Sequence, residues 1–350
     1  MMDSISFAEE GQIGLVTLNR PQALNALTLD MIQALQQQLL TWESNPNICA
    51  VVIRGEGEKA FCAGGDVRWL YEAGLSHNPQ QMQFFWHEYR LNHYINRYPK
   101  PYIALMDGIT MGGGVGVSLH GSYPVATECF VFAMPETSIG FFPDIGASYL
   151  LSRCPDAVGL YLGLTGNRIS AEDAYALGLI KAVVPSESIE KLLHELINRD
   201  LSNHPQSVID DCIKQFAKAN SQAPIEEQRK VIKDCFSRSS VEDIFNALNE
   251  RGDDWSTTIL NSLHFKAPLS LKITFAQIHK AASLNMAQCM AMDYCLVSHF
   301  MQGHDFYEGV RALLIDKDKS PRWQPSTLNQ VSDAMVMEYF AGNEELILII

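Results

Sequence analysis

The sequence lacks every common spacing of metal-binding or disulfide-forming cysteines. Its eight cysteines stand as scattered single residues, with no C-x-x-C pair and no cluster of cysteine and histidine. A zinc site or a disulfide framework requires such spacing, so neither is predicted. We therefore expect reduced thiols in the protein core, no bound metal, and a cytoplasmic location.

Positive charge is scarce as well. There are 26 Lys and Arg residues against 40 Asp and Glu, which gives a net charge of −14 and a pI near 5.1. Nucleic acid binding needs a basic surface, so a nucleic-acid partner is excluded, whereas a small anionic ligand needs only a few local cations. No apolar run reaches membrane-spanning length. Residues 1–12 lack the basic and apolar segments of a secretory signal. A soluble protein without a membrane partner is expected.

The known nucleotide-binding and serine-hydrolase motifs are also missing. In "MGGGVGVSLHG" the sixth position from Gly112 is Val117, and from Gly114 it is Leu119, so G-x-G-x-x-G fails. G-x-x-x-x-G-K-[ST] and G-x-S-x-G do not occur. The sequence thus predicts no nicotinamide cofactor, no nucleoside triphosphate and no serine nucleophile.

Alternating strand and helix patterns fill the first 200 residues. Period-two alternation predicts a hairpin over residues 5–20, and helical periodicity predicts helices near 27–46 and 79–100. "PYIALMDGIT", residues 101–110, is predicted as one strand. From residue 170 the pattern is mostly helical, with one short strand in "KAVVPS". We expect an α/β domain over residues 1–198 and a helical C-terminal region over 199–350.

Two glycine-rich turns follow predicted strands. The first is Ala63-Gly64-Gly65-Asp66, and the second contains the triplet 112–114. Glycine lets a ligand approach main-chain N–H groups closely, and such groups at a helix start favour negative charge. The alternatives are an ordinary turn with Asp66 as helix N-cap, and glycines that only allow close helix packing. Neither turn identifies a site alone.

Two carboxylates stand in the otherwise apolar or small-residue stretch "AMPETSIGFFPDIGASY". Burying an unpaired carboxylate raises its pKa and costs several kcal/mol, so a partner or a function is expected. Asp144 could instead cap a helix through "IGASYLL", and for Asp144 the cap and a catalytic role are equally favoured. Glu136 could accept backbone N–H groups, but its surroundings favour catalysis.

Together, these stretches supply main-chain donors at two glycine turns and two acids in an apolar setting. That combination suits a reaction that builds negative charge on a carbonyl oxygen. Two N–H groups would stabilise the oxyanion, and a carboxylate would act as base or nucleophile.

The same residues resemble the enoyl-CoA hydratase/isomerase (crotonase) superfamily. The resemblance lies in "GLVTLNRPQALNALTLDM", "AFCAGGD", "DGITMGGGVG" and "MPETSIGFFPDIGASYLL". It extends to the 3-hydroxyisobutyryl-CoA hydrolase branch through "FFWHEYRLNHYINRYPKPYIAL" and "HDFYEGVRALLIDKDKSPRWQP", and so covers nearly the whole chain. It implies a spiral of repeated ββα units followed by a helical C-terminal region that covers the active site.

The resemblance also implies roles for single residues. It assigns the oxyanion hole to the backbone N–H groups of Gly65 and Gly113, and the two catalytic acid positions to Glu136 and Asp144. The implied substrate contacts are Glu88, Arg68 near the coenzyme A phosphates, Asn25 in the segment lining the coenzyme A channel, and Ala63 in the first glycine turn. For Arg68 and Asn25 a plain surface role is equally open.

One departure from the superfamily bears on the reaction. Hydratases carry a second catalytic Glu shortly after the glycine triplet, where this chain has Gly116. The resemblance therefore implies hydrolysis of a short β-hydroxyacyl-CoA thioester, with 3-hydroxyisobutyryl-CoA of valine breakdown as the expected substrate. An enoyl-CoA hydratase or isomerase, and a non-catalytic acyl-CoA-binding protein, remain the alternatives.

The acyl pocket and the assembly are less determined. Phe141, Phe142 and Trp86 are candidates for the pocket wall. No cofactor beyond the coenzyme A of the substrate is expected. A homo-oligomer is possible, and chain length does not decide it.

Overall fold

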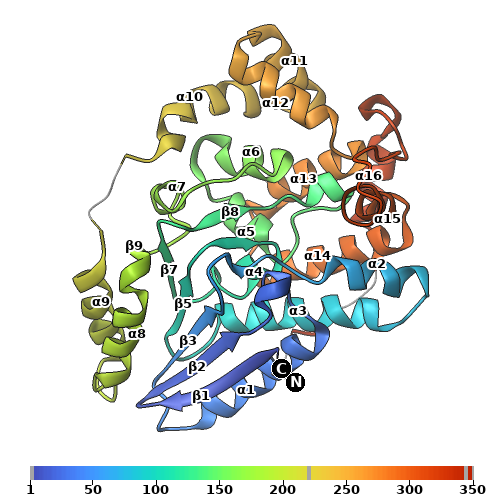
Figure 1. Cartoon of the computed structure of the whole chain (residues 1–350). Coiled ribbons are helices and arrows are strands. Elements are labelled where there is room, and N and C mark those ends of the chain that lie inside the picture. Colours follow the sequence, from blue (N-terminus) through green and yellow to red (C-terminus); the bar gives the residue numbers. More distant parts are fainter. Residues whose placement is uncertain (1–3, 219–221, 343–345, 349–350) are drawn as a thin grey trace.

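Two β-sheets, formed by residues 5–184, are surrounded by helices (Figure 1). The computed structural model describes residues 4–218, 222–342 and 346–348. Helices make up most of the chain after the last strand. The predicted α/β class with a helical C-terminal part is confirmed. Of the described helices, none is long and apolar enough to cross a bilayer.

The larger sheet has six strands in the order β1-β2-β3-β5-β7-β9. The predicted hairpin is its antiparallel edge, and each later strand adds in parallel. Parallel pairing requires a crossover between consecutive strands. The strands are β1 (Ile5–Glu10), β2 (Ile13–Leu18), β3 (Ala50–Gly55), β5 (Tyr102–Met106), β7 (Tyr123–Thr127) and β9 (Ala182–Val184).

A second sheet, of three parallel strands, lies alongside the first. Its order is β4 (Ala60–Cys62), β6 (Ile109–Met111) and β8 (Val131–Ala133). Each of three successive units sends its first strand to the large sheet and its second strand to the small one. The chain therefore winds as a spiral, and the three β4, β6 and β8 strands end at the same edge.

The prediction of a single strand over residues 101–110 is wrong. The structure divides it into β5 and β6, which belong to different sheets. The break lies at Gly108, whose φ is +89°, a conformation that L side chains rarely adopt. A Cβ at Gly108 would lie 2.6 Å from the carbonyl oxygen of Lys59. A glycine inside a strand pattern thus marks a bend with close backbone contact.

Both predicted helices of the N-terminal half form. In α1 (Leu29–Ser44) the Thr28 side chain accepts from the Met31 N–H, and Leu35, Leu39 and Trp42 are buried on one face. Helix α3 (Gln80–Asn96) begins after Pro79. The first glycine turn leads into α2 (Val67–Leu75), where Asp66 is indeed the N-cap. The glycine triplet leads into α4 (Gly113–Gly116).

The helix expected through "IGASYLL" forms as α5 (Ala147–Leu151). It is followed by α6 (Val158–Thr165), α7 (Ala171–Ala176), α8 (Ile189–Asn198), α9 (Pro205–Phe216), α10 (Pro224–Phe236), α11 (Val241–Arg251), α12 (Asp254–His264), α13 (Pro268–Ala281), α14 (Met286–Gln302), α15 (Asp305–Val310) and α16 (Asp333–Tyr339).

Two hydrophobic clusters hold these elements together. Buried residues of α8 and α9 pack with one face of the large sheet. The main cluster joins the rest of the N-terminal half with buried residues of α10 to α16. The division into 1–198 and 199–350 stays a prediction, because α8 and α9 lie on either side of it and share one cluster.

The cysteines are mostly, but not all, core residues. No disulfide joins any of the eight, all of which lie in the described residues. Four are buried and three are half-buried. The expectation is wrong for Cys129, which is exposed, because it follows the end of β7 in a surface turn.

Helix α15 packs backbone to backbone against the short 3-10 helix η2 (Glu136–Ile139). A Cβ at Gly309 would lie 2.3 Å from the carbonyl carbon of Ile139. A Cβ at Gly140 would lie 2.2 Å from the carbonyl oxygen of Asp305. Glycine at both positions lets the C-terminal region touch the segment that carries Glu136.

Gly309→Ala should lower the free energy of unfolding by about 1–3 kcal/mol, because rigid backbone atoms would have to move to admit the methyl group. The control is Gly163→Ala in α6. Its Cβ would first meet Ile278 Cδ1, the end of a flexible side chain, at 2.6 Å. Urea denaturation of both variants measures the difference. Equal stability of Gly309→Ala and the wild type would contradict the close packing.

Candidate active site

Three loops that follow β4, β6 and β8 meet around one cavity. They contain the first glycine turn, the glycine triplet and the Glu136 segment. The cavity lies outside the carboxyl ends of parallel strands, a common place for ligand sites. The cavity has a volume of about 230 Å³. Its lining includes Ala63, Gly65, Leu70, Phe84, Phe85, Glu88, Gly113, Glu136, Ser138, Ile139, Phe141, Asp144, Phe306, Leu313 and Leu314.

The backbone N–H groups of Gly65 and Gly113 are available to a ligand. The loop around Gly65 is fixed on both sides, because Leu27 N donates to Gly64 O at 2.8 Å and Asp66 N donates to Leu27 O at 2.9 Å. Within the described chain, neither the Gly65 nor the Gly113 amide donates to another backbone group. A Cβ at Gly113 would lie 3.3 Å from Gly65 N. The two donors therefore lie close together.

Glu136 is buried beside these donors. Its side chain is 7% exposed, and Oε2 has no hydrogen-bond partner among the described residues. A Cβ at Gly112 would lie 3.3 Å from Glu136 Oε1, which places the carboxyl next to the glycine triplet. Burial raises the pKa of Glu136 well above its usual value, and the neighbouring Asp144 raises it further. A buried carboxyl with a strongly perturbed pKa in a cavity is a candidate catalytic group.

Asp144 lies close to Glu136 and has one strong partner. Tyr89 on α3 donates its hydroxyl to Asp144 Oδ2 at 2.8 Å. The alternative that the Asp144 side chain caps a helix is wrong. The N-cap residue of α5 is Gly146, and no side chain accepts a capping hydrogen bond there. Burial raises the pKa of Asp144 to about 7, although the Tyr89 hydrogen bond opposes the rise. Near neutral pH this group can therefore gain or lose a proton.

Glu88 on α3 completes a cluster of three acids. It is 2% exposed, and its Oε1 has no partner in the described part of the chain. A Cβ at Gly113 would lie 2.5 Å from this oxygen, so the carboxylate points at the second glycine turn. Burial raises the pKa of Glu88, and the charges of Asp144 and Glu136 add to the rise. Like charges held together cannot all ionise easily.

Buried side chains hold the turn that carries Asp144. Asp293 on α14 accepts from Gly146 N at 2.8 Å and from Gln277 Nε2 at 2.7 Å. Gln277 Nε2 also donates to Pro143 O at 2.9 Å. His120 Nε2 donates to Ile145 O at 2.7 Å, and burial lowers the pKa of His120 to about 4, so it is neutral. Backbone groups on both sides of Asp144 are thus fixed from three elements.

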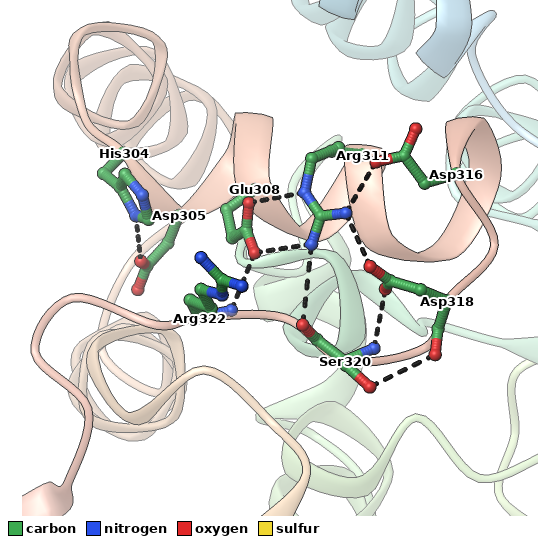
Figure 2. A network of polar contacts seen from close by, with 8 residues as sticks. All are labelled: His304, Asp305, Glu308, Arg311, Asp316, Asp318, Ser320 and Arg322. Atoms are coloured by element: carbon green, nitrogen blue, oxygen red, sulfur yellow. Dashed lines mark hydrogen bonds and ion pairs between the residues drawn. The ribbon is translucent and has the colours of Figure 1, made fainter.

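The C-terminal region closes the cavity through a π-helical turn, η5 (Arg311–Ile315), which contributes Leu313 and Leu314. Figure 2 shows how this turn is held. Arg311 makes two 2.8 Å hydrogen bonds to the carboxylate of Glu308. On its other side it bonds Asp316 and Asp318, each at 2.7 Å. π-Helical turns occur frequently at functional sites.

The implied substrate contacts do not all lie at the cavity. Ala63 lines it. Arg68 is exposed on α2, and its Nη2 donates to Leu314 O at 2.6 Å, next to the cavity wall. Asn25 is fully buried away from the lining and accepts from Arg20 N at 2.9 Å. Its Nδ2 donates to Glu56 O and Ala60 O, both at 2.9 Å. Asn25 shapes the loop by these bonds, and contact of its side chain with a ligand stays a prediction.

Of the three aromatic candidates for the pocket wall, only Phe141 is in the lining. Phe142 packs behind it with a ring separation of 4.6 Å. Trp86 lies under the guanidinium of Arg90, 3.9 Å from the ring centroid. On a helix, only positions three or four apart share a face, so Trp86 and Glu88 point in different directions.

Asn92 on α3 fills the space beside Gly116. A Cβ at Gly116 would lie 2.7 Å from Asn92 Nδ2 and 2.9 Å from its Cγ. Asn92 is fully buried, so it has little room to withdraw. A glutamate at position 116 would therefore clash with this amide.

Sequence reasoning missed several residues that shape the site. Tyr89 is adjacent to Glu88, and its hydroxyl could have been recognised as a donor to a buried acid. Asp293 stands alone in the apolar run "CMAMDYCLV", so the argument used for Glu136 would have found it. For Asn92 and Leu314 no local signal exists. Their contacts depend on segments far away in sequence.

No group of three or more His, Cys, Asp or Glu side chains is arranged to hold a metal ion in residues 4–218, 222–342 and 346–348. The residues around the cavity instead offer backbone donors and carboxyl groups. That the protein needs neither a metal nor a separate cofactor stays a prediction.

Comparison with known proteins identifies relatives over nearly the whole chain. Residues 13–340 match the model of a family described as enoyl-CoA hydratase/isomerase. The chain is 44% identical over 344 residues to "3-hydroxyisobutyryl-CoA hydrolase, mitochondrial" of Danio rerio, covering 97% of this chain and 90% of the relative. The protein of the same name in Homo sapiens is 41% identical over 349 residues, covering 97% and 88%.

Solved structures share the fold along the full length. A structure titled carnitinyl-CoA dehydratase from Mycobacterium thermoresistibile has a TM-score of 0.93 at 36% identity and covers 99% of both chains. One titled enoyl-CoA hydratase from Rhodobacter sphaeroides has a TM-score of 0.89 at 31% identity and covers 97% of both. The predicted crotonase-like fold is thereby confirmed.

The expected cytoplasmic location is contradicted. The relatives in Danio rerio and Homo sapiens are named mitochondrial proteins. The expectation depended on missing secretion signals and unpaired cysteines. Those features do not distinguish the cytoplasm from another reducing compartment.

Glu88→Gln should be more stable than the wild type, by a difference that increases as the pH rises. The pKa of Glu88 is raised by folding, so ionisation of this carboxyl destabilises the folded chain increasingly above its unfolded pKa. The amide removes that cost. We expect a higher melting temperature than wild type at about pH 8 and a smaller difference at about pH 5. Thermal melts followed by circular dichroism measure both. Glu72→Gln, at an exposed position, is the control. A lower melting temperature of Glu88→Gln than of the wild type at the higher pH would refute the inference that ionised Glu88 destabilises the folded chain.

Proposed function

Because the chain belongs to the enoyl-CoA hydratase/isomerase family, we propose that it hydrolyses 3-hydroxyisobutyryl-CoA to 3-hydroxyisobutyrate and coenzyme A. The relatives with this activity in their names are 41–44% identical over most of the chain. The chain is a coenzyme A thioester hydrolase, and the acyl-CoA substrate brings coenzyme A with it. Valine catabolism is the process in which this reaction takes place.

The observation that carries the proposal is the position of the acids relative to the amides. One cavity holds the Gly65 and Gly113 amides together with Glu136 and Asp144. A tetrahedral intermediate needs donors at its oxyanion and a group that delivers the nucleophile. The Gly65 and Gly113 amides and the Glu136 carboxyl are our candidates for these two roles, and no Ser-His-Asp arrangement is required.

In the proposed reaction the thioester carbonyl oxygen accepts hydrogen bonds from Gly65 N and Gly113 N. Glu136 then attacks the carbonyl carbon, coenzyme A leaves as the thiolate, and water cleaves the mixed anhydride. Alternatively, Glu136 takes a proton from a water molecule that attacks directly. Both routes need Glu136 ionised and the oxyanion donors in place.

The other polar groups are assigned to the substrate's hydroxyl, the water and the coenzyme A. Asp144, with its pKa near neutrality, and Glu88 hold the hydroxyl of the acyl group or the attacking water. Arg68 lies at the C-terminal wall of the cavity, where its remaining donors can reach a phosphate. Leu313, Leu314 and Phe141 supply the apolar surface for the short acyl chain.

A hydratase is the second candidate, because two solved structures with similar folds have hydratase or dehydratase titles. Adding water across a double bond uses two acids, one at the position of Gly116. Asn92 occupies that space. The second acid of this chain is Asp144, which lies on the Glu136 segment instead. This arrangement favours thioester hydrolysis.

Thiol release from 3-hydroxyisobutyryl-CoA, 3-hydroxypropionyl-CoA, acetyl-CoA and crotonyl-CoA tests the reaction. Loss of the conjugated enoyl absorbance is followed in parallel. Fast thiol release from the hydroxyacyl compounds supports the hydrolase. Loss of enoyl absorbance without thiol release would support the hydratase, and binding without turnover would leave an acyl-CoA-binding protein.

Glu136→Gln should lower kcat by about 100-fold or more, because the amide neither attacks the thioester nor takes a proton. Affinity for coenzyme A should change little, since the carboxyl faces the acyl pocket. Steady-state kinetics and calorimetric titration with coenzyme A measure the two quantities. The exposed Glu72→Gln again serves as the control. Near-normal turnover of Glu136→Gln would show that another group performs the reaction.

A further inference from the structure

A lysine from the C-terminal region reaches the Glu136 segment. Lys266 lies in the turn between α12 and α13, and its Nζ donates to Ser138 Oγ at 2.6 Å. Ser138 lines the cavity two residues after Glu136. The next backbone amide, Ala267 N, donates to Thr137 O at 3.2 Å. The turn is therefore fastened to η2 at two points, and the ammonium is held beside the acids.

Among the described residues that line the cavity, the charged side chains are all acids: Glu88, Glu136 and Asp144. Asp144 raises the pKa of Glu136 by repulsion, and both of these acids raise the pKa of Glu88. Helix α15 brings another carboxyl, Asp305, whose backbone packs on Gly140. As far as the described residues go, Lys266 is the one cation that lowers the pKa of Glu136.

The ammonium is charged under ordinary conditions. Burial lowers the pKa of Lys266 to about 8, and the charge of Glu136 opposes this change. At neutral pH most molecules thus carry the positive charge. Helix α6, which also packs on η2, has no charged side chain. Lys272 on α13 is turned to other partners, donating to Val331 O at 2.8 Å and pairing with Glu242 at 2.6 Å.

We propose that Lys266 is a positioning residue for the hydrolysis: its ammonium, held by Ser138 next to the cavity, keeps Glu136 ionised and ready to attack or to take a proton. This inference rests on the proposed hydrolase function. Against burial and the charge of Asp144, which raise the pKa of Glu136, the ammonium is the charge that favours the ionised carboxyl. An opposite charge nearby is the usual means by which a protein favours the ionised form.

If Lys266 acts through its positive charge, removing that charge should lower kcat by an amount that depends on pH. Lys266→Met and Lys266→Gln remove the charge, so Glu136 should hold its proton to higher pH and the acid limb of the kcat profile should move upward. We expect kcat to fall about tenfold or more at about pH 7, with KM nearly unchanged. Toward about pH 9 the loss should shrink, because the wild-type ammonium, whose pKa is about 8, has by then largely lost its own charge.

Two further variants separate charge from shape. Lys266→Arg keeps a positive charge throughout the range and should retain the wild-type acid limb. Lys272→Met removes a positive charge from the same region but away from the acids, and should also leave the limb unchanged. The experiment measures kcat and KM for 3-hydroxyisobutyryl-CoA from about pH 6 to about pH 9 in the full-length chain.

The possible results are distinct. A loss in the neutral variants that is the same at every pH would mean that Lys266 only fastens the turn, which overturns the inference. An unchanged acid limb in Lys266→Met and Lys266→Gln would also overturn the inference. A shifted acid limb in Lys266→Arg would overturn it as well, and this variant remains a test even if the neutral variants do not fold. Absence of thioester hydrolysis by the wild type would instead refute the proposed function.

Discussion

Parallel pairing of β4, β6 and β8 is the constraint on which the site depends. Three strands of three residues each end at one edge, so the segments that come after them meet there. Those segments supply the first glycine turn, the glycine triplet and Glu136. Each strand is too short to be stable alone, and the large sheet beside it fixes its position. The proposed catalytic groups thus come from distant parts of the sequence and still lie within one cavity.

The acid cluster has an energetic cost that the surrounding chain offsets only in part. Glu88, Glu136 and Asp144 are buried together, and two of their oxygens lack partners among the described residues. The Tyr89 hydroxyl and the Lys266 ammonium favour ionised carboxyls, whereas burial favours protonated ones. The balance leaves the pKa of all three acids raised, that of Asp144 to about 7, at the expense of fold stability.

The C-terminal region is part of the site rather than an addition to it. Leu313 and Leu314 form a wall of the cavity, and Arg311 holds the turn that presents them (Figure 2). Asp293 and Gln277 fix the turn around Asp144. Gly309 lets α15 touch the Glu136 segment. A chain without these helices would leave the acids open to water, which screens charges and lowers shifted pKa values.

The sequence by itself determined the α/β class, the hairpin, the main helices, the two glycine turns and the two dry acids, because these depend on local periodicity, glycine and apolar neighbours. From the sequence, β5 and β6 were predicted as one strand, because the continuous apolar pattern gives no sign of the bend at Gly108. Only the tertiary structure decided that Tyr89 bonds Asp144, that Asn92 fills the space at Gly116, and that Lys266 lies beside Glu136. These contacts join residues 24 to 130 positions apart, and no local pattern encodes which distant side chains the fold will bring together.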